Sequence, residues 1–249
     1  MNFALFLFVG IIVTGIVYAI EHLWLKKKRS SEQKAPWIVR ELSSFFPILI
    51  AVFVLRSFVI EPFRIPSSSL EPTLRIGDFV AVNKFIYGVR LPIIEKKIID
   101  IRQPKRGDIV VFRWPPKPKF DFIKRVIGLP GDEIRYENKQ FYINGQKINL
   151  TPTAMSFEKP PAFKEFIEDL PGQTHHIFQR SDMAPFDFKI TVPKDHYLVI
   201  GDNRDDSADS RFWGFVPDNY LRGQAFGIWM SWDQEHWRVR FNRIGKAIH

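Results

Sequence analysis

The chain has 249 residues, enough for one medium domain or two small ones together with anchoring segments. It contains no cysteine, which excludes disulfides, thiolate nucleophiles and cysteine-based zinc or iron–sulfur sites. The formal charge of +9 admits nucleic acid, an anionic membrane surface or an acidic partner, so the placement of the basic residues has to decide among these.

The first predicted element is a transmembrane helix over residues 1–20. Residues 2–20 carry no charge, and such a run is about long enough to cross a hydrocarbon core of ~30 Å. A cleaved signal peptide is the alternative, but it would start with basic residues, whereas here the basic residues 26–29 follow the run.

A second transmembrane helix is predicted over residues 42–60. Its only charge is Arg56, near the far end, where a long basic side chain can reach the membrane interface. A buried helix of a soluble domain is the alternative. It is disfavoured because residues 45–55 carry no polar side chain at any helical phase.

The connecting segment 21–41 is rich in lysine and arginine, and short loops of this kind stay on the cytoplasmic side. The N-terminus and everything after Glu61 are therefore expected outside. A basic loop facing an anionic lipid leaflet explains part of the positive charge. We accordingly predict membrane lipid as a partner and no nucleic acid.

After Glu61 the sequence changes to short runs of Val, Ile, Phe and Tyr separated by Gly, Pro, Asp and Asn, which predicts a mainly β fold. Expected strands include residues 108–113, 122–128, 196–200 and 224–232. The Asn144-Gly145 pair is typical of a two-residue hairpin turn.

One part of this region breaks the pattern. Residues 151–187 contain five prolines and few strand-like runs. We therefore predict a β core made of residues 61–133 and 196–249, with a smaller inserted β and loop region over residues 134–195.

Ser67, Ser68 and Ser69 lie between Pro66 and Pro72, directly after the second predicted span. A serine hydroxyl is a weak nucleophile until a base accepts its proton. Without cysteine or a histidine in a motif, the candidate bases are lysine, aspartate and glutamate. A polar turn at the membrane surface is the alternative.

Lys124 is the candidate base. Strand alternation over residues 121–128 puts it on the same face as Phe122 and Val126, where an ammonium group is poorly solvated. A general base needs a pKa of about 8 instead of ~10.4, and burial supplies that change. Most strand lysines point to solvent, which is the alternative.

The loop 201–211 follows a predicted strand and is dense in hydrogen-bonding groups that suit the orientation of a catalytic side chain. Its aspartates also suggest calcium, but the central glycine and terminal glutamate of an EF-hand loop are missing. The six histidines show no metal-ligand spacing, and His175 and His176 are expected in a solvated loop. We predict no metal site.

In this order after two spans, segments 66–74, 124–132 and 201–211 resemble those of type I signal peptidases. Shorter strings at 56–58, 61–63, 76–78, 104–108 and 213–217 extend the resemblance to most of the chain outside the inserted region. It implies a multi-pass protein of the bacterial plasma (inner) membrane with a periplasmic catalytic domain. Its expected activity is to remove signal peptides from exported preproteins after an Ala-x-Ala type site. It implies no cofactor, and we expect a monomer.

By the same resemblance, Ser69 is the nucleophile and Lys124 the general base of a Ser-Lys dyad. Ser67 and the backbone N–H of Ser69 form the oxyanion hole. Ser207 holds the lysine amine in place.

Further roles follow from the resemblance. Asp209 and Arg211 form a supporting ion pair, and Arg125 is structural. The residues matching the apolar S1 and S3 pockets are Phe63, Ile65, Leu74, Phe122 and Ile123.

The sequence departs from the family pattern at two positions. Leu70 replaces a methionine and preserves its bulk. Ser68 replaces a common glycine, and glycine permits backbone angles that serine resists, so Ser68 is expected to affect the position of Ser69 or the width of the cleft.

Two rival functions remain open. A self-cleaving repressor-like protease shares the dyad but needs a DNA-binding segment. A non-catalytic membrane-anchored β module would bind exported proteins and be indifferent to loss of Ser69 or Lys124. Near the C-terminus, Trp229, Trp237 and Phe241 lie among basic residues such as Arg243, a mixture suited to the bilayer interface, with core packing as the alternative for Trp229.

Overall fold

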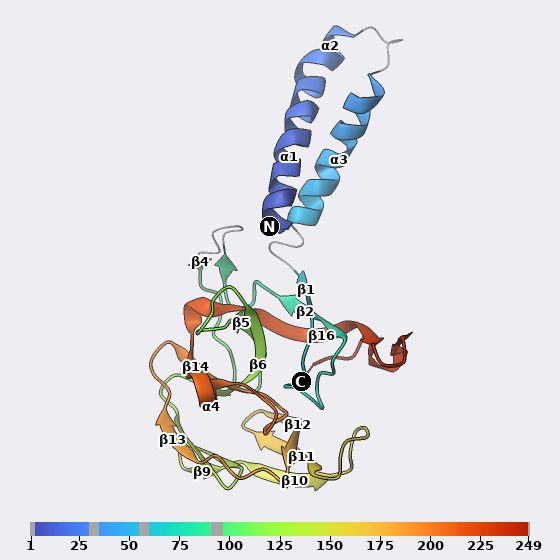
Figure 1. Ribbon diagram of the computed structural model, residues 1–249. Coiled ribbons are helices and arrows are strands. Elements are labelled where there is room, and N and C mark those ends of the chain that lie inside the picture. The colour runs from blue at the N-terminus through green and yellow to red at the C-terminus, as the bar shows by residue number, and fades with distance from the viewer. Residues whose placement is uncertain (1–2, 30–34, 55–59, 91–96, 249) are drawn as a thin grey trace. The chain divides into compact units, whose positions relative to one another are not determined.

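The computed structural model describes residues 3–29, 35–54, 60–90 and 97–248 (Figure 1). Contacts between the residues divide the chain into two units. The first is Met1–Glu61 with Val89–Ile99, and the second is Pro62–Gly88 with Asp100–His249.

The first unit is a pair of apolar helices that lie side by side (Figure 1). Its helical elements are α1 (Phe3–Ile20), η1 (Glu21–Leu25), α2 (Lys26–Lys28) and α3 (Trp37–Val54). Two stretches, Leu5–Lys28 and Trp37–Val54, are long and apolar enough to cross a membrane. The same unit contains the short antiparallel pair of β3 (Val89–Arg90) and β4 (Lys97–Ile99).

The helix ends differ from the prediction. α3 begins at Trp37, not at residue 42, because Arg40 and Glu41 continue the helix although they interrupt the apolar run. Ile60, predicted to end this helix, opens strand β1 instead. Residues 55–59, which include Arg56, lie outside the described residues.

The second unit is built on an eight-stranded sheet with the order β1-β2-β16-β5-β6-β14-β15, and β17 pairs with β16. In this sheet order, each pair of neighbouring strands from β2 through β16, β5, β6 and β14 to β15 is antiparallel. The strands are β1 (Ile60–Arg64), β2 (Asp78–Asn83), β5 (Ile109–Arg113), β6 (Asp121–Gly128), β14 (His196–Ile200), β15 (Val216–Pro217), β16 (Leu221–Asp233) and β17 (Arg238–Val239). The described part of the chain is therefore mainly β with two N-terminal apolar helices.

Two smaller sheets lie between β6 and β14 in the chain. One has the order β13-β7-β8-β9, and the other has the order β10-β11-β12. The strands are β7 (Glu133–Glu137), β8 (Gln140–Ile143), β9 (Gln146–Lys147), β10 (Asn149–Thr153), β11 (Phe163–Leu170), β12 (Gln173–Arg180) and β13 (Phe188–Thr191). They belong to the same compact unit as the main sheet, so a separate inserted region stays a prediction.

The predicted hairpin turn is confirmed, because Asn144 and Gly145 join β8 to β9 with φ of 51° and 80°. Residues 151–187, which show few strand-like runs in the sequence, contain the regular strands β11 and β12. Their inward side chains include Glu165 and Glu168, which are buried, so the strands lack a clear apolar alternation. His175 lies on β12 and is 4% exposed, so the solvated loop predicted for it is wrong.

The two faces of β5 and β6 pack against different apolar clusters. Val111 and Ile123 belong to one cluster, whereas Val110 and Val126 belong to the other. Because β-strand side chains alternate between faces, Lys124 shares the face of Val110, its partner in the register. The sheet thus directs an ammonium group toward an apolar environment.

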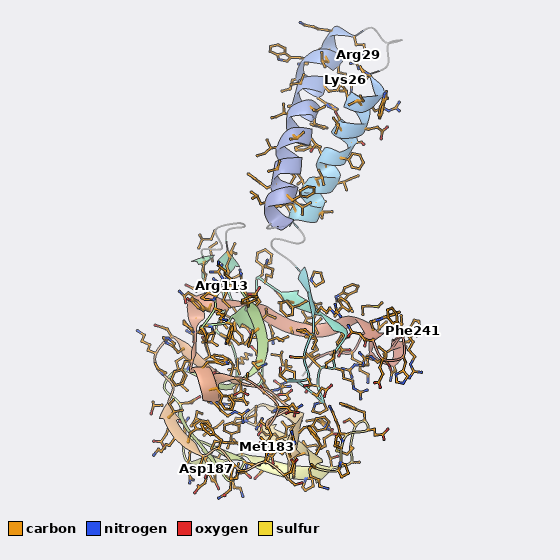
Figure 2. All side chains as sticks on the ribbon, in the orientation of Figure 1. Lys26, Arg29, Arg113, Met183, Asp187 and Phe241 are labelled. Atoms are coloured by element: carbon orange, nitrogen blue, oxygen red, sulfur yellow. The ribbon has the colours of Figure 1, made fainter. Side chains whose placement is uncertain are left out.

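Aromatic side chains near the C-terminus are largely exposed, as Figure 2 shows for Phe241. Trp237 and Phe241 are each 79% exposed, and Trp229 is 51% exposed beside Phe79. The alternative that Trp229 packs in the core is therefore wrong. Arg243 differs from its expected surface position, because it is buried and pairs with Asp78 at 2.6 Å.

Candidate active site

The serine segment is fixed by the core beneath it. Leu70 and Leu74 are fully buried in one apolar cluster, and the N–H of Leu74 donates to the carbonyl of Leu70 at 2.9 Å. The N–H of Glu71 donates to the carbonyl of Ser68 at 2.9 Å. These bonds close a tight turn that holds Ser69 with only 7% of its surface exposed.

Lys124 meets Ser69 at this turn. Its Nζ donates a hydrogen bond to Ser69 Oγ at 2.6 Å, although 55 residues separate them in the chain. Lys124 is 4% exposed, and its ammonium group lies 5.6 Å from the centre of the Phe122 ring. A nucleophile and a base within hydrogen-bonding distance are the minimum arrangement for hydroxyl activation.

The surroundings of Lys124 alter its protonation. Burial lowers the pKa of Lys124 from its ordinary 10.5 to about 8, because an ammonium ion loses its hydration there. Asp209 and Asp202 act in the opposite direction, and Arg211 lowers the pKa further. Desolvation outweighs the two carboxylates, so a neutral amine is accessible near physiological pH.

Ser67 and Ser207 are the other two serines predicted to act here. Ser67 is exposed, and its Oγ lies 3.4 Å from Ser69 Oγ. The Ser207 hydroxyl is buried and has no hydrogen-bond partner within the described part of the chain. A Cβ built on Gly201 would lie 2.2 Å from Ser207 Oγ and 2.4 Å from the Ser69 carbonyl oxygen, so these two oxygens lie close together.

Asn203 binds the backbone of the serine segment through two hydrogen bonds. Its backbone N–H donates to the carbonyl of Ser69 at 3.1 Å, and its amide group donates to the carbonyl of Ser68 at 3.2 Å. Sequence reasoning identified the loop 201–211 as orienting but did not single out this asparagine. Its only sequence signal was its place in a loop dense in polar groups.

Arg125 and Asp202 form a buried pair behind the serine segment. The guanidinium donates two hydrogen bonds of 2.8 Å to the carboxylate and a third of 2.8 Å to the carbonyl of Gly107. Thr73 donates to the same carboxylate at 2.6 Å. This pair links β6 with the loop after β14 and with the end of the serine segment.

Asp209 and Arg211 support the loop in a similar way. The Asp209 carboxylate accepts two hydrogen bonds of 2.8 Å from Arg211 and one of 3.0 Å from the N–H of Gly201. Asp209 also caps the short helix α4 (Ser210–Trp213). Arg211 in turn donates to the carbonyl of Arg204.

A second buried pair braces the loop against β11. Arg204 and Glu168 are joined by two hydrogen bonds of 2.7 and 2.5 Å, with both side chains fully buried. On β12, the N–H of Phe178 donates to the carbonyl of Asp202, and its carbonyl accepts from the N–H of Arg204, each at 2.9 Å. His175 lies 3.3 Å from Glu168, and burial lowers its pKa, so it stays neutral there.

The residues predicted to line the substrate pockets do not all gather in one cluster. Ile65, Leu74 and Ile123 are buried together, and Phe63 packs against them. Phe122 lies on the other face of β6 and stacks on Trp114, because neighbouring strand residues point to opposite faces. The assignment of these five residues to substrate pockets stays a prediction.

The substitution at Ser68 leaves the backbone unstrained. Ser68 is absent from the positions with positive φ, so the backbone here does not require glycine. The predicted effect on the position of Ser69 lacks that physical cause. Within the described residues, no three His, Asp or Glu side chains form a group that could hold a metal ion.

Comparison with known proteins gives one consistent relationship. The family described as signal peptidase, peptidase S26 matches residues 38–232. A signal peptidase I from Pseudomonas aeruginosa is 38% identical over 100% of this chain and 99% of its own length. One from Buchnera aphidicola is 35% identical over 98% of each chain.

Among solved structures, a signal peptidase I from Enterococcus faecalis is 28% identical, covering 50% of this chain and 98% of its own, with a TM-score of 0.31. The family model covers most of the chain, and the relatives match it over nearly their whole length. Together with the two apolar N-terminal helices, they support an inner-membrane peptidase that removes signal peptides. The chain therefore belongs to the signal peptidase I family.

Proposed function

We propose that this chain is a serine endopeptidase that cuts signal peptides from exported preproteins with a Ser69–Lys124 dyad. One observation carries the proposal: Lys124 Nζ lies 2.6 Å from Ser69 Oγ. The same burial that isolates this contact lowers the pKa of Lys124 to about 8, which is the protonation behaviour that a general base needs.

In the first half of the reaction, the neutral amine of Lys124 accepts the hydroxyl proton of Ser69. Ser69 Oγ attacks the carbonyl carbon of the scissile bond, and negative charge develops on the carbonyl oxygen. When the C–N bond breaks, the Lys124 ammonium group returns the proton to the leaving amine, which is the new N-terminus of the mature protein. The signal peptide remains as an ester on Ser69.

In the second half, water attacks this ester. Lys124 accepts a proton from the water, and the bond between Ser69 Oγ and the carbonyl carbon breaks. The proton then passes to Ser69 Oγ, which restores the hydroxyl and the neutral amine. A dyad of this kind needs no carboxylate to orient the base, because an amine presents its lone pair without the tautomer problem of an imidazole.

The oxyanion in both halves is assigned to two donors, the hydroxyl of Ser67 and the backbone N–H of Ser69. Ser67 Oγ is 3.4 Å from Ser69 Oγ and exposed, so it is free to rotate toward a bound carbonyl. Each such donor is typically worth about 10²–10³ in rate. We assign Ser207 to holding the amine of Lys124 during the reaction. Its buried hydroxyl lies near the Ser69 carbonyl and has no hydrogen-bond partner among the described residues, so it is available for this bond.

The proposed substrate has small side chains before the cut, in a small-x-small pattern of the Ala-x-Ala type. This preference rests on the family resemblance, which assigns Ile65, Leu74 and Ile123 to apolar pockets for small side chains, and the three residues are packed together in one buried cluster. We place the catalytic unit on the periplasmic side, because the basic segment between the helices favours the cytoplasm. Only residues 55–68 separate α3 from Ser69, which limits how far the nucleophile lies from the membrane along the chain.

The test is cleavage of a preprotein with an Ala-x-Ala site by the full-length protein in lipid or detergent. Ser69→Ala and Lys124→Ala are each expected to lower kcat by about 10⁴-fold or more, as for other nucleophile and base pairs. Lys147→Ala, an exposed lysine on β9, is the matched control and is expected to cleave normally.

The pH dependence of cleavage is an independent test of Lys124 as the general base. Activity requires neutral Lys124, so kcat/KM is expected to rise with pH through about 8 and to level off above it. Intact preprotein in the presence of folded, substrate-binding wild type would overturn the dyad. That result would favour a non-catalytic module that binds exported proteins.

A further inference from the structure

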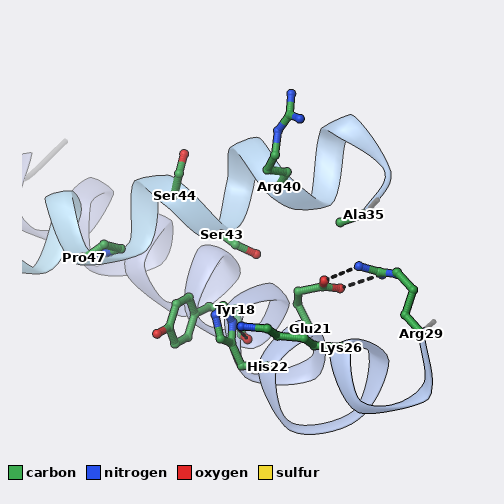
Figure 3. Close-up of a pocket in the computed structure, with 10 residues that line it drawn as sticks. All are labelled: Tyr18, Glu21, His22, Lys26, Arg29, Ala35, Arg40, Ser43, Ser44 and Pro47. Atoms are coloured by element: carbon green, nitrogen blue, oxygen red, sulfur yellow. Dashed lines mark hydrogen bonds and ion pairs between the residues drawn. The ribbon is translucent and has the colours of Figure 1, made fainter. Parts of the chain in front are cut away.

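The helical unit contains a pocket that the proposed peptidase reaction does not use. It has a volume of about 600 Å³ and lies where η1 and α2 face the start of α3 (Figure 3). The residues that give it its chemistry are Tyr18, His22, Lys26, Arg29, Arg40 and Ser43. Its basic residues stand at one end of a helix pair, and large apolar side chains are exposed along α1 and α3.

The pocket is positively charged. It contains Lys26, Arg29 and Arg40 but only one carboxylate, Glu21. Arg29 donates two hydrogen bonds of 2.7 and 3.1 Å to Glu21, as Figure 3 shows. Lys26 forms no hydrogen bond or ion pair with any residue in the described ranges, and Arg40 has only a contact of 3.5 Å with Glu41. Lys26 is therefore available to a ligand, and the exposed Arg40 side chain, which points away from Lys26 in Figure 3, is held only by this weak contact.

Ser43 adds an uncharged polar group. It is 7% exposed, and its hydroxyl has no hydrogen-bond partner within the described ranges. Pro47, one turn later, has no N–H with which to continue the helical bond to the Ser43 carbonyl. In a membrane, an unsatisfied polar group costs several kcal/mol, so a ligand that supplies hydrogen bonds here is favoured.

The backbone at this level is also unusual. Glu21–Leu25 forms a π-helical turn, and such turns are rare and frequently occur at functional sites. Within this region the Tyr18 and His22 rings stack with their centres 4.1 Å apart. They give the pocket a flat aromatic wall beside its cations.

We propose that this pocket binds the phosphate-bearing headgroup of an anionic phospholipid. Lys26 would hold the phosphate from within the pocket. Arg40, whose exposed side chain points away from Lys26 in Figure 3, would turn toward the phosphate, and Ser43 would bond to a headgroup hydroxyl. Basic pockets between membrane helices suit such headgroups, because the cations lie beside a surface that accommodates acyl chains. α3 provides that surface, since Ile48 is 56% exposed and Val52 is 42% exposed. A free phosphate ion has no acyl chains and would gain no binding energy from this apolar surface.

The test measures lipid binding directly, without cleavage. Full-length protein in a neutral detergent is titrated with phosphatidylglycerol, and bound lipid is counted by native mass spectrometry. The test variant is Lys26→Gln/Arg40→Gln. The matched control is Lys27→Gln/Lys28→Gln, which removes the same charge from the same end of the helix pair at positions that do not line the pocket.

For the test variant, the apparent Kd for phosphatidylglycerol is expected to rise at least about tenfold, and for the control less than about threefold. Ser43→Ala, which retains every charge, is expected to raise it by about threefold through the lost hydrogen bond. Helix content by circular dichroism should be the same in all variants. Phosphatidylcholine is expected to bind weakly to all of them.

Three results would overturn the proposal. Equal weakening in the test and control variants would mean that the lipid responds only to surface charge. Equal binding of phosphatidylcholine would remove the requirement for an anionic headgroup. Competition by glycerol 3-phosphate at the concentrations that suffice for phosphatidylglycerol would identify the ligand as a soluble anion and not a lipid.

Discussion

Replacing Lys124 by methionine should abolish cleavage and yet stabilise the protein at pH 7. The pKa of Lys124 falls from an ordinary 10.5 to about 8 on folding, and at 1.36 kcal/mol per pKa unit this corresponds to about 3 kcal/mol against the charged form. Methionine has similar bulk and no charge to desolvate. It forfeits the hydrogen bond to Ser69, worth about 1 kcal/mol. The net gain is about 2 kcal/mol.

The pH dependence of the stability difference between Lys124→Met and wild type distinguishes removal of a buried charge from an improvement in packing. Because the folded pKa of Lys124 is lowered, the unfolded chain binds more protons between pH 8 and 10.5, and wild-type stability rises across that interval. Below pH 8 Lys124 is protonated in both the folded and the unfolded protein, so the full cost of burying its charge remains. The advantage of Lys124→Met should therefore be present at pH 7 and disappear by about pH 10.

The free energy of unfolding would be measured by urea denaturation of the full-length protein in micelles, followed by tryptophan fluorescence at pH 7 and pH 10. Lys147→Met on β9 is the matched control, because Lys147 is exposed and should show no pH-dependent difference. If Lys124→Met is less stable than wild type at pH 7 by the same amount as at pH 10, the desolvation argument is refuted.

Three further substitutions test the surroundings of the dyad. Asp202→Asn removes the carboxylate charge facing the fully buried Arg125 and should lower the free energy of unfolding by about 3–5 kcal/mol in urea titrations; a change below 1 kcal/mol would contradict this. Gly201→Ala places a Cβ 2.4 Å from the Ser69 carbonyl oxygen and should cost about 1–3 kcal/mol with a lower kcat, so an unaltered kcat would count against the packing seen here. Ser68→Gly should leave kcat unchanged in the cleavage assay and cost about 0.5–1 kcal/mol, since the backbone does not use positive φ; faster cleavage would show that serine does restrict the site.

Features encoded by local sequence were predictable. The two apolar helices follow from long hydrophobic runs, and the turn at Asn144-Gly145 follows from the positive φ that these residues tolerate. The face on which Lys124 lies follows from strand alternation alone. The prediction that Lys124 contacts Ser69 came from the family resemblance, because no local sequence pattern specifies a distance between residues 55 positions apart.

Features that depend on distant partners were missed. The sequence suggests that Glu168 is a surface residue, because a glutamate is rarely buried without a partner and its partner Arg204 is 36 residues away in the chain. Asn203 gives no sign in the sequence that both of its donors reach the serine segment. The start of α3 at Trp37 was missed because helix propensity continues where hydrophobicity stops.

The backbone bonds of Phe178 on both sides of Asn203 have a practical consequence for engineering. They make β12 part of the frame that positions the nucleophile, so excision of residues 134–195 would release the loop that grips Ser69. Met183, labelled in Figure 2, is exposed, and among the described residues none of 182–186 forms a backbone hydrogen bond to the loop 201–211, so this connection is a more suitable place to insert a reporter domain. Changes of chain length can accumulate there while the reactive centre keeps its geometry.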